Sequence, residues 1–155
     1  MSIILKYGLK INKLILITDI ISASLMLLFL YTAVSKLLNY ESFKSVLIMS
    51  PFLRPFAGII AWVLPAAEIV IVILLFFQKT RLKGLYVSFI TIAIFTVYIT
   101  CMVIFTPRLP CNCGGVLKSL TWTQHIFFNL FILLLTVTGI VLYRKINNVA
   151  TIVPP

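Results

Sequence analysis

Charged residues are scarce in this chain of 155 residues, since only 10% of them are Asp, Glu, Lys or Arg. A water-soluble domain of similar length has about a quarter charged residues and about half apolar ones. Here 62% of the residues are hydrophobic, so much of the surface must face something other than water. The shortage of charge excludes an ordinary soluble domain and indicates contact with a lipid bilayer.

Acidic residues are rarer still: three stand against 13 Lys and Arg, for a formal net charge of +10. In a soluble protein this balance would suggest a nucleic-acid partner. The basic residues instead form short clusters between apolar runs, which is how membrane proteins fix their orientation. No basic face of useful length exists, so we expect no nucleic-acid binding.

Four apolar runs are long enough to cross a hydrocarbon core, which takes about 20 helical residues. We expect transmembrane helices near residues 15–37, 56–77, 84–106 and 122–143. The first run is too long for the apolar part of a cleavable signal peptide, about 7–15 residues, so we expect it to be a retained span. The alternating pattern of a membrane β-barrel is absent. The predicted fold is all-α, a four-helix transmembrane bundle that forms a single domain over residues 1–155.

Basic residues beside the spans predict the orientation. Eight fall on the face that holds both termini and the turn between the second and third spans, and five fall on the opposite face. The positive-inside bias therefore puts both termini in the cytoplasm. On the outer face, Phe43, Val46 and Leu47 share one side of segment 40–51, which predicts a short helix lying on the membrane surface.

Cys111 and Cys113 lie in an irregular segment between the third and fourth spans, on the predicted periplasmic face. That compartment is oxidising, and disulfides persist there. Two cysteines one residue apart close only a small, strained ring, and a strained disulfide exchanges readily. Arg108 and Lys118 nearby favour the reactive thiolate. The pair therefore indicates thiol–disulfide exchange.

Other interpretations of the cysteines stay open. The pair would also suit a structural disulfide, two free packed thiols, or a soft-metal site with His125 as an extra ligand. Two Cys and one His do not complete the four ligands of a structural zinc site, so we assign no metal residues. Cys101, in the third span, is either a small buried apolar residue or a resolving thiol for the pair.

Glu68 is the costliest residue for a membrane segment, because a carboxyl near mid-bilayer usually needs a protein partner. We expect it to face the bundle interior, with Lys36 as a candidate partner that lies higher, near the outer face. The alternative is a Lys36 that snorkels to the surface and a protonated Glu68 bonded to another neighbour. His125 and Asn129 share a face of the fourth helix and would line a site under the cysteines, unless His125 faces water.

Three stretches resemble the MauE branch (methylamine utilisation) of the bacterial DoxX-like membrane proteins. They are residues 33–37, residues 62–68, and the cysteine motif 111–115 followed by Trp122, His125 and Asn129. The resemblance covers about residues 20–143. It implies a role in maturing a disulfide-rich periplasmic dehydrogenase subunit alongside a thioredoxin-like partner. The layout is also loosely similar to quinone-linked disulfide-generating enzymes, which carry Cys-x-x-Cys where this chain has Cys-x-Cys.

Our leading hypothesis is a redox accessory protein in which Cys111 and Cys113 exchange disulfides with a periplasmic thioredoxin-like protein. His125, Asn129, Glu68, Lys36 and Cys101 are the supporting candidates. No cofactor is assigned, although a membrane quinone near His125 is a candidate acceptor for the electrons. The rival hypothesis is a non-enzymatic assembly subunit or chaperone whose cysteines only shape a docking loop.

Overall fold

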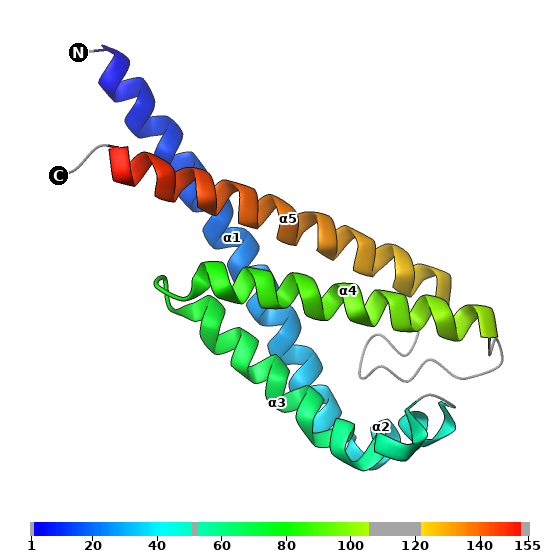
Figure 1. The fold of residues 1–155 in the computed structure, drawn as a ribbon. Helices are drawn as coiled ribbons and strands as arrows, with labels where there is room; N and C mark the ends of the chain where they lie inside the picture. The colour runs from blue at the N-terminus through cyan, green and yellow to red at the C-terminus, as the bar shows by residue number, and fades with distance from the viewer. Residues whose placement is uncertain (1, 51–52, 106–121, 153–155) are drawn as a thin grey trace.

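The computed structural model describes residues 2–50, 53–105 and 122–152, and within them the side chains of 12–50, 53–104 and 123–148 (Figure 1). These residues are helical apart from short turns, and they contain no strand. The helices are α1 (Ser2–Leu38), α2 (Tyr40–Met49), the 3₁₀ turn η1 (Arg54–Phe56), α3 (Ala57–Phe76), α4 (Arg81–Phe105) and α5 (Trp122–Ile152). The all-α prediction is confirmed.

The four long helices are apolar enough to cross a membrane over Asn12–Leu38, Arg54–Phe76, Arg81–Ile104 and Thr123–Asn148. Only 22–28% of each apolar window is buried inside the molecule, so most of the aliphatic side chains point outward, where lipid lies. The predicted four-helix transmembrane bundle is therefore confirmed. Outside the spans, α1 starts at Ser2 and α5 runs on to Ile152, well beyond the predicted ends.

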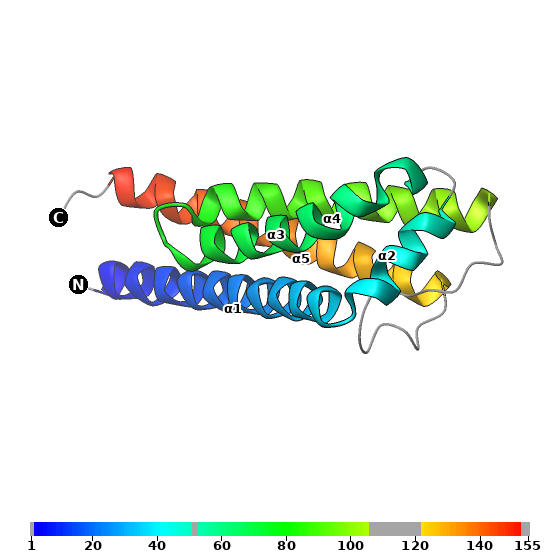
Figure 2. The same cartoon turned by 90° about the horizontal axis from the view of Figure 1, so that it is seen from below.

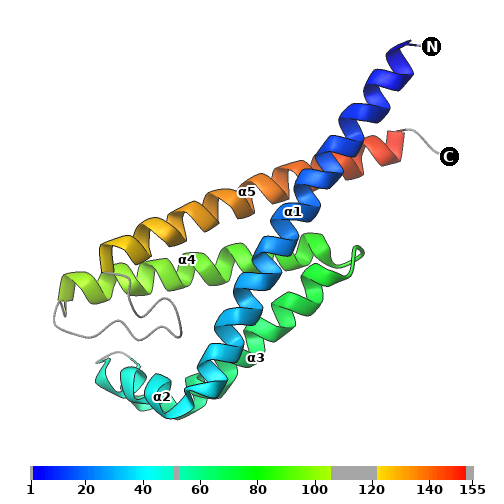
Figure 3. The same ribbon diagram turned by 180° about the vertical axis from the view of Figure 1, so that it is seen from behind.

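The long helices form a ring in which α1 and α4 each pack against both α3 and α5 (Figures 1 and 2). The start of α1, the end of α5 and the α3–α4 turn (residues 77–80) lie together at one end, here called the terminal end (Figure 3). Helix α2, the end of α4 and the start of α5 lie at the other, here called the α2 end. The chain thus passes up and down the bundle four times.

Aliphatic side chains from all four long helices fill the centre, among them the fully buried Leu25, Ile71, Leu75 and Leu85. Gly84 lets α4 approach the end of α3, because a Cβ on this residue would lie 2.9 Å from the Leu75 backbone nitrogen. Helices α3 and α4 are therefore packed closely next to the turn that joins them.

Helix α2 is the short surface helix that the sequence predicted, and it packs on α3. Its Phe43 and Leu47 are buried against Ala57 and Ala61, which are small enough for the two helices to meet. Helix α2 therefore lies against the first two turns of α3.

Candidate functional site

Lys36 of α1 and Glu68 of α3 form an ion pair in the bundle interior. The Lys36 ammonium donates to Glu68 Oε1 at 2.6 Å, and the two side chains are only 5% and 8% exposed. The ammonium also donates to the Thr32 carbonyl at 3.4 Å, one turn earlier in α1. An unpaired charge in the bundle interior would be very costly, so each residue permits the burial of the other.

The prediction that Glu68 faces protein and meets a polar partner is confirmed. The alternative in which Lys36 snorkels to the surface is wrong, since Lys36 is only 4% exposed and bonds to Glu68. Lys36 is in the last turn of α1, and its ammonium bonds one turn back, to the Thr32 carbonyl, as well as to Glu68. The Lys36 side chain therefore reaches from the end of α1 into the bundle interior, where Glu68 lies about three turns into α3.

Helix α2 covers this ion pair. The Lys36 ammonium lies 5.9 Å from the centre of the buried Phe43 ring, within the range of a cation–π contact. Ser50, just after α2, donates to Met102 Sδ of α4 at 3.7 Å and so ties this connection to the far side of the bundle. These contacts separate the charged pair from the surface at the α2 end.

His125 and Asn129 of α5 point into the same interior. They are 1% and 6% exposed, which confirms the predicted shared face and rules out a His125 that faces water. The His125 ring meets Phe95 of α4 edge-on, with the ring centres 5.9 Å apart, and it lies within electrostatic reach of Lys36. The structure thus brings together candidates from α1, α3 and α5 that are far apart in sequence.

Several buried polar atoms of this site have no hydrogen-bond partner among the described residues: Glu68 Oε2, His125 Nδ1 and Asn129 Nδ2. Buried polar groups in proteins are almost always hydrogen-bonded, and an exception needs an explanation. Here the exceptions cluster where a membrane bundle would otherwise be apolar. The cluster offers both donors and acceptors to a further polar group, which is the property of a site rather than of a core.

Cys111 and Cys113 lie outside the described residues. The chain leaves α4 at Phe105 and re-enters α5 at Trp122, and both points are at the α2 end (Figure 1). His125 is in the first turn of α5, as predicted, and so it follows the cysteine-bearing segment directly.

Cys101 lies one turn before the end of α4. Its side chain is half buried, and it forms no disulfide with any residue that the structure describes. Across the described ranges, no three His, Cys, Asp or Glu residues gather as a metal site would require.

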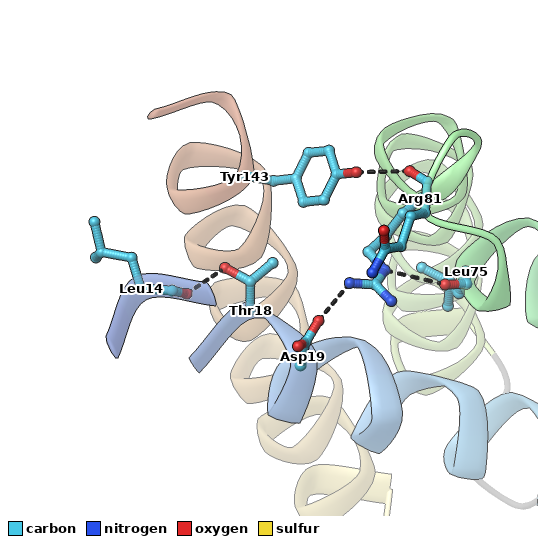
Figure 4. Close-up of polar contacts among 7 residues, drawn as sticks. Leu14, Thr18, Asp19, Leu75, Arg81 and Tyr143 are labelled. Atoms are coloured by element: carbon cyan, nitrogen blue, oxygen red, sulfur yellow. Dashed lines mark hydrogen bonds and ion pairs between the residues drawn. The ribbon is translucent and has the colours of Figure 1, made fainter. Parts of the chain in front are cut away.

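A second polar cluster, which was not predicted from the sequence, lies at the terminal end (Figure 4). Arg81 forms an ion pair with Asp19 of α1 and donates from Nε to the Leu75 carbonyl at 3.3 Å. The Tyr143 hydroxyl of α5 donates to the Gln78 carbonyl at 2.6 Å. One signal was available: Asp19 is an acid within a span, and Arg81 begins another span at the same end of the bundle.

Comparison with known proteins identifies a family but no individual relative. A family model described as methylamine utilisation protein MauE matches residues 13–142, which is most of the chain and includes all the residues of the buried site. No curated protein and no solved structure matches the chain.

Proposed function

Because the chain belongs to the MauE family of methylamine utilisation proteins and crosses the membrane several times, we propose that it is a redox accessory protein of the bacterial inner membrane. It exchanges disulfides through Cys111 and Cys113 and so supports the maturation of exported proteins. The observation that carries this proposal is the buried polar site of Lys36, Glu68 and His125, at the end of the bundle where the cysteine-bearing segment joins α4 and α5.

The proposed exchange has two steps. A thiolate of a reduced thioredoxin-like partner attacks the Cys111–Cys113 disulfide, breaks its S–S bond and forms a mixed disulfide. The second partner thiol then attacks that mixed disulfide, and the partner leaves oxidised. Two electrons and two protons have moved, so Cys111 and Cys113 end as thiols.

The pair must then pass two electrons and two protons onward, and a membrane quinone is the acceptor that we propose. Asn129 and His125 fit such a group, because quinone oxygens accept hydrogen bonds and Asn129 Nδ2 is a buried donor without a described partner. His125 Nδ1 is a second donor in one of its tautomers. Lys36 and Glu68 support the site by holding α1 and α3 in register beside it.

The orientation belongs to the same proposal. The basic residues of the sequence divide eight to five between the two sides of the membrane, and the smaller count includes Lys36, which is buried in its ion pair with Glu68, so the terminal end faces the cytoplasm. The cysteines then face the periplasm, where disulfides form and where a thioredoxin-like partner would reach them.

A redox titration of the Cys111–Cys113 pair tests the proposal, with a Cys101→Ser variant used so that only the pair titrates. An exchangeable couple should titrate between about −120 and −270 mV, the range of catalytic disulfides. A midpoint below about −300 mV would identify a structural disulfide and would favour the assembly subunit or chaperone instead.

A further inference from the structure

The terminal end contains a cavity of about 200 Å³ that the proposed redox function does not use. It lies between α1, the α3–α4 turn and α5, so three separate parts of the chain build it. Its lining is formed by Ile15, Thr18, Asp19, Gln78, Arg81, Tyr143, Ile146 and Asn147.

Charges of both signs face this cavity. The Arg81 guanidinium is held by Asp19 and by the Leu75 carbonyl (Figure 4). A guanidinium has five N–H donors, so these two bonds leave donors for another acceptor. The Asp19 side chain is 46% exposed and a carboxylate accepts about four hydrogen bonds, so it also has capacity left.

The cavity lies at the depth of the lipid headgroups. Arg81 is the first residue of one apolar span, and Asn147 is the second-to-last residue of another. Tyr143 lines the same cavity, and tyrosines concentrate at this level of membrane proteins. On α1, Ile20 and Leu27 follow Asp19 toward the middle of the span, and they are 57% and 69% exposed, so they give acyl chains an apolar surface.

We propose that this cavity binds the headgroup of phosphatidylethanolamine. The primary ammonium of the lipid donates to the Asp19 carboxylate, and its phosphate accepts from Arg81, as guanidinium groups commonly bind phosphate. The exposed Lys79 and Lys83 on the neighbouring turn add attraction for the phosphate. A purely anionic headgroup fits less well, because Asp19 would repel it.

Native mass spectrometry tests this directly. The detergent-purified chain is mixed with equimolar phosphatidylethanolamine, phosphatidylcholine and phosphatidylglycerol that carry the same acyl chains. We expect about tenfold more bound phosphatidylethanolamine than phosphatidylcholine, whose methylated amine cannot donate the charge-assisted hydrogen bond. Equal retention of the three lipids, or a preference for phosphatidylglycerol, would overturn the proposal.

Two substitutions then locate the bound lipid. Asp19→Asn should abolish the preference for phosphatidylethanolamine, whereas Glu41→Gln, the same change on exposed α2 at the other end, should keep it. Retention of the preference in Asp19→Asn would place the lipid elsewhere and refute the assignment.

A second pair of variants leaves the Asp19–Arg81 ion pair intact. Ile15→Trp should fill the cavity and so prevent the hydrogen bond between the lipid ammonium and Asp19. The bound phosphatidylethanolamine should therefore fall about tenfold. Leu16→Trp, at an adjacent residue that does not line the cavity, should bind as the parent does. Equal binding by both variants would contradict the proposed site.

Discussion

Glu68 and Lys36 place one charge of each sign inside a bundle whose core is mainly apolar. Glu68→Leu should lower the free energy of unfolding by about 3–5 kcal/mol, because it leaves the Lys36 ammonium buried without its partner. The double variant Lys36→Met/Glu68→Leu should recover most of that loss, since neither charge remains. Denaturant unfolding in detergent micelles measures both. A single variant as stable as the parent would mean that the ammonium finds another partner.

His125 can be tested apart from its packing. His125→Phe keeps an aromatic ring against Phe95 but removes both ring nitrogens. We expect a folded bundle with unchanged far-UV circular dichroism. The rate at which quinone reoxidises the Cys111–Cys113 pair should fall about 100-fold or more, the usual cost of losing a proton-transfer group. Growth of a complemented methylamine-utilising strain provides a second readout. Full activity of this variant would leave His125 a packing role alone.

The approach of α4 to α3 depends on Gly84. In Gly84→Ala the new Cβ would press on backbone atoms of Leu74 and Leu75, which cannot rotate away. The strain costs about 1–3 kcal/mol, which outweighs the gain of about 1 kcal/mol in helix propensity. Gly58→Ala is the matched control, since no atom lies within 4 Å of its Cβ and we expect no loss of stability. Thermal unfolding in detergent compares them, and equal midpoints would contradict the close approach.

At the scale of elements, the sequence predicted most of what local composition determines. Uninterrupted apolar runs located the four spans, and the spacing of Phe43 and Leu47 located α2. The relative height of Lys36 and Glu68 was not predictable in this way. It depends on how α1 and α3 pack against each other, which brings the Lys36 ammonium to Glu68.

The candidate site was predicted only in part, because its contacts also depend on how separate helices pack together. The spacing of His125 and Asn129 placed both on one face of a helix, and burial confirms that this face is the inner one. Phe95 and Phe43 were not identified, because in an apolar span an aromatic residue of the site looks like any other lipid-facing or core residue. Such contacts arise only when separate helices pack together.

For the whole molecule, the distribution of basic residues predicts that the terminal end faces the cytoplasm. A membrane-impermeant thiol reagent applied to reduced, intact spheroplasts should therefore label Cys111 and Cys113. The double variant Cys111→Ser/Cys113→Ser is the control that shows how much labelling comes from Cys101. Labelling of the pair only after lysis would invert the topology and remove the argument from an oxidising compartment.

The most direct test of the proposed function is to trap the exchange partner. In a Cys101→Ser background, Cys111→Ser and Cys113→Ser should each abolish activity, because a single sulfur cannot complete the exchange. Both variants should still fold, since a disulfide that closes so short a loop adds little stability. We predict that at least one of them accumulates a mixed disulfide with a periplasmic protein, seen on a non-reducing gel as a larger band that disappears with reductant. If both variants keep full activity and trap nothing, the cysteines are not a redox couple and the account is contradicted.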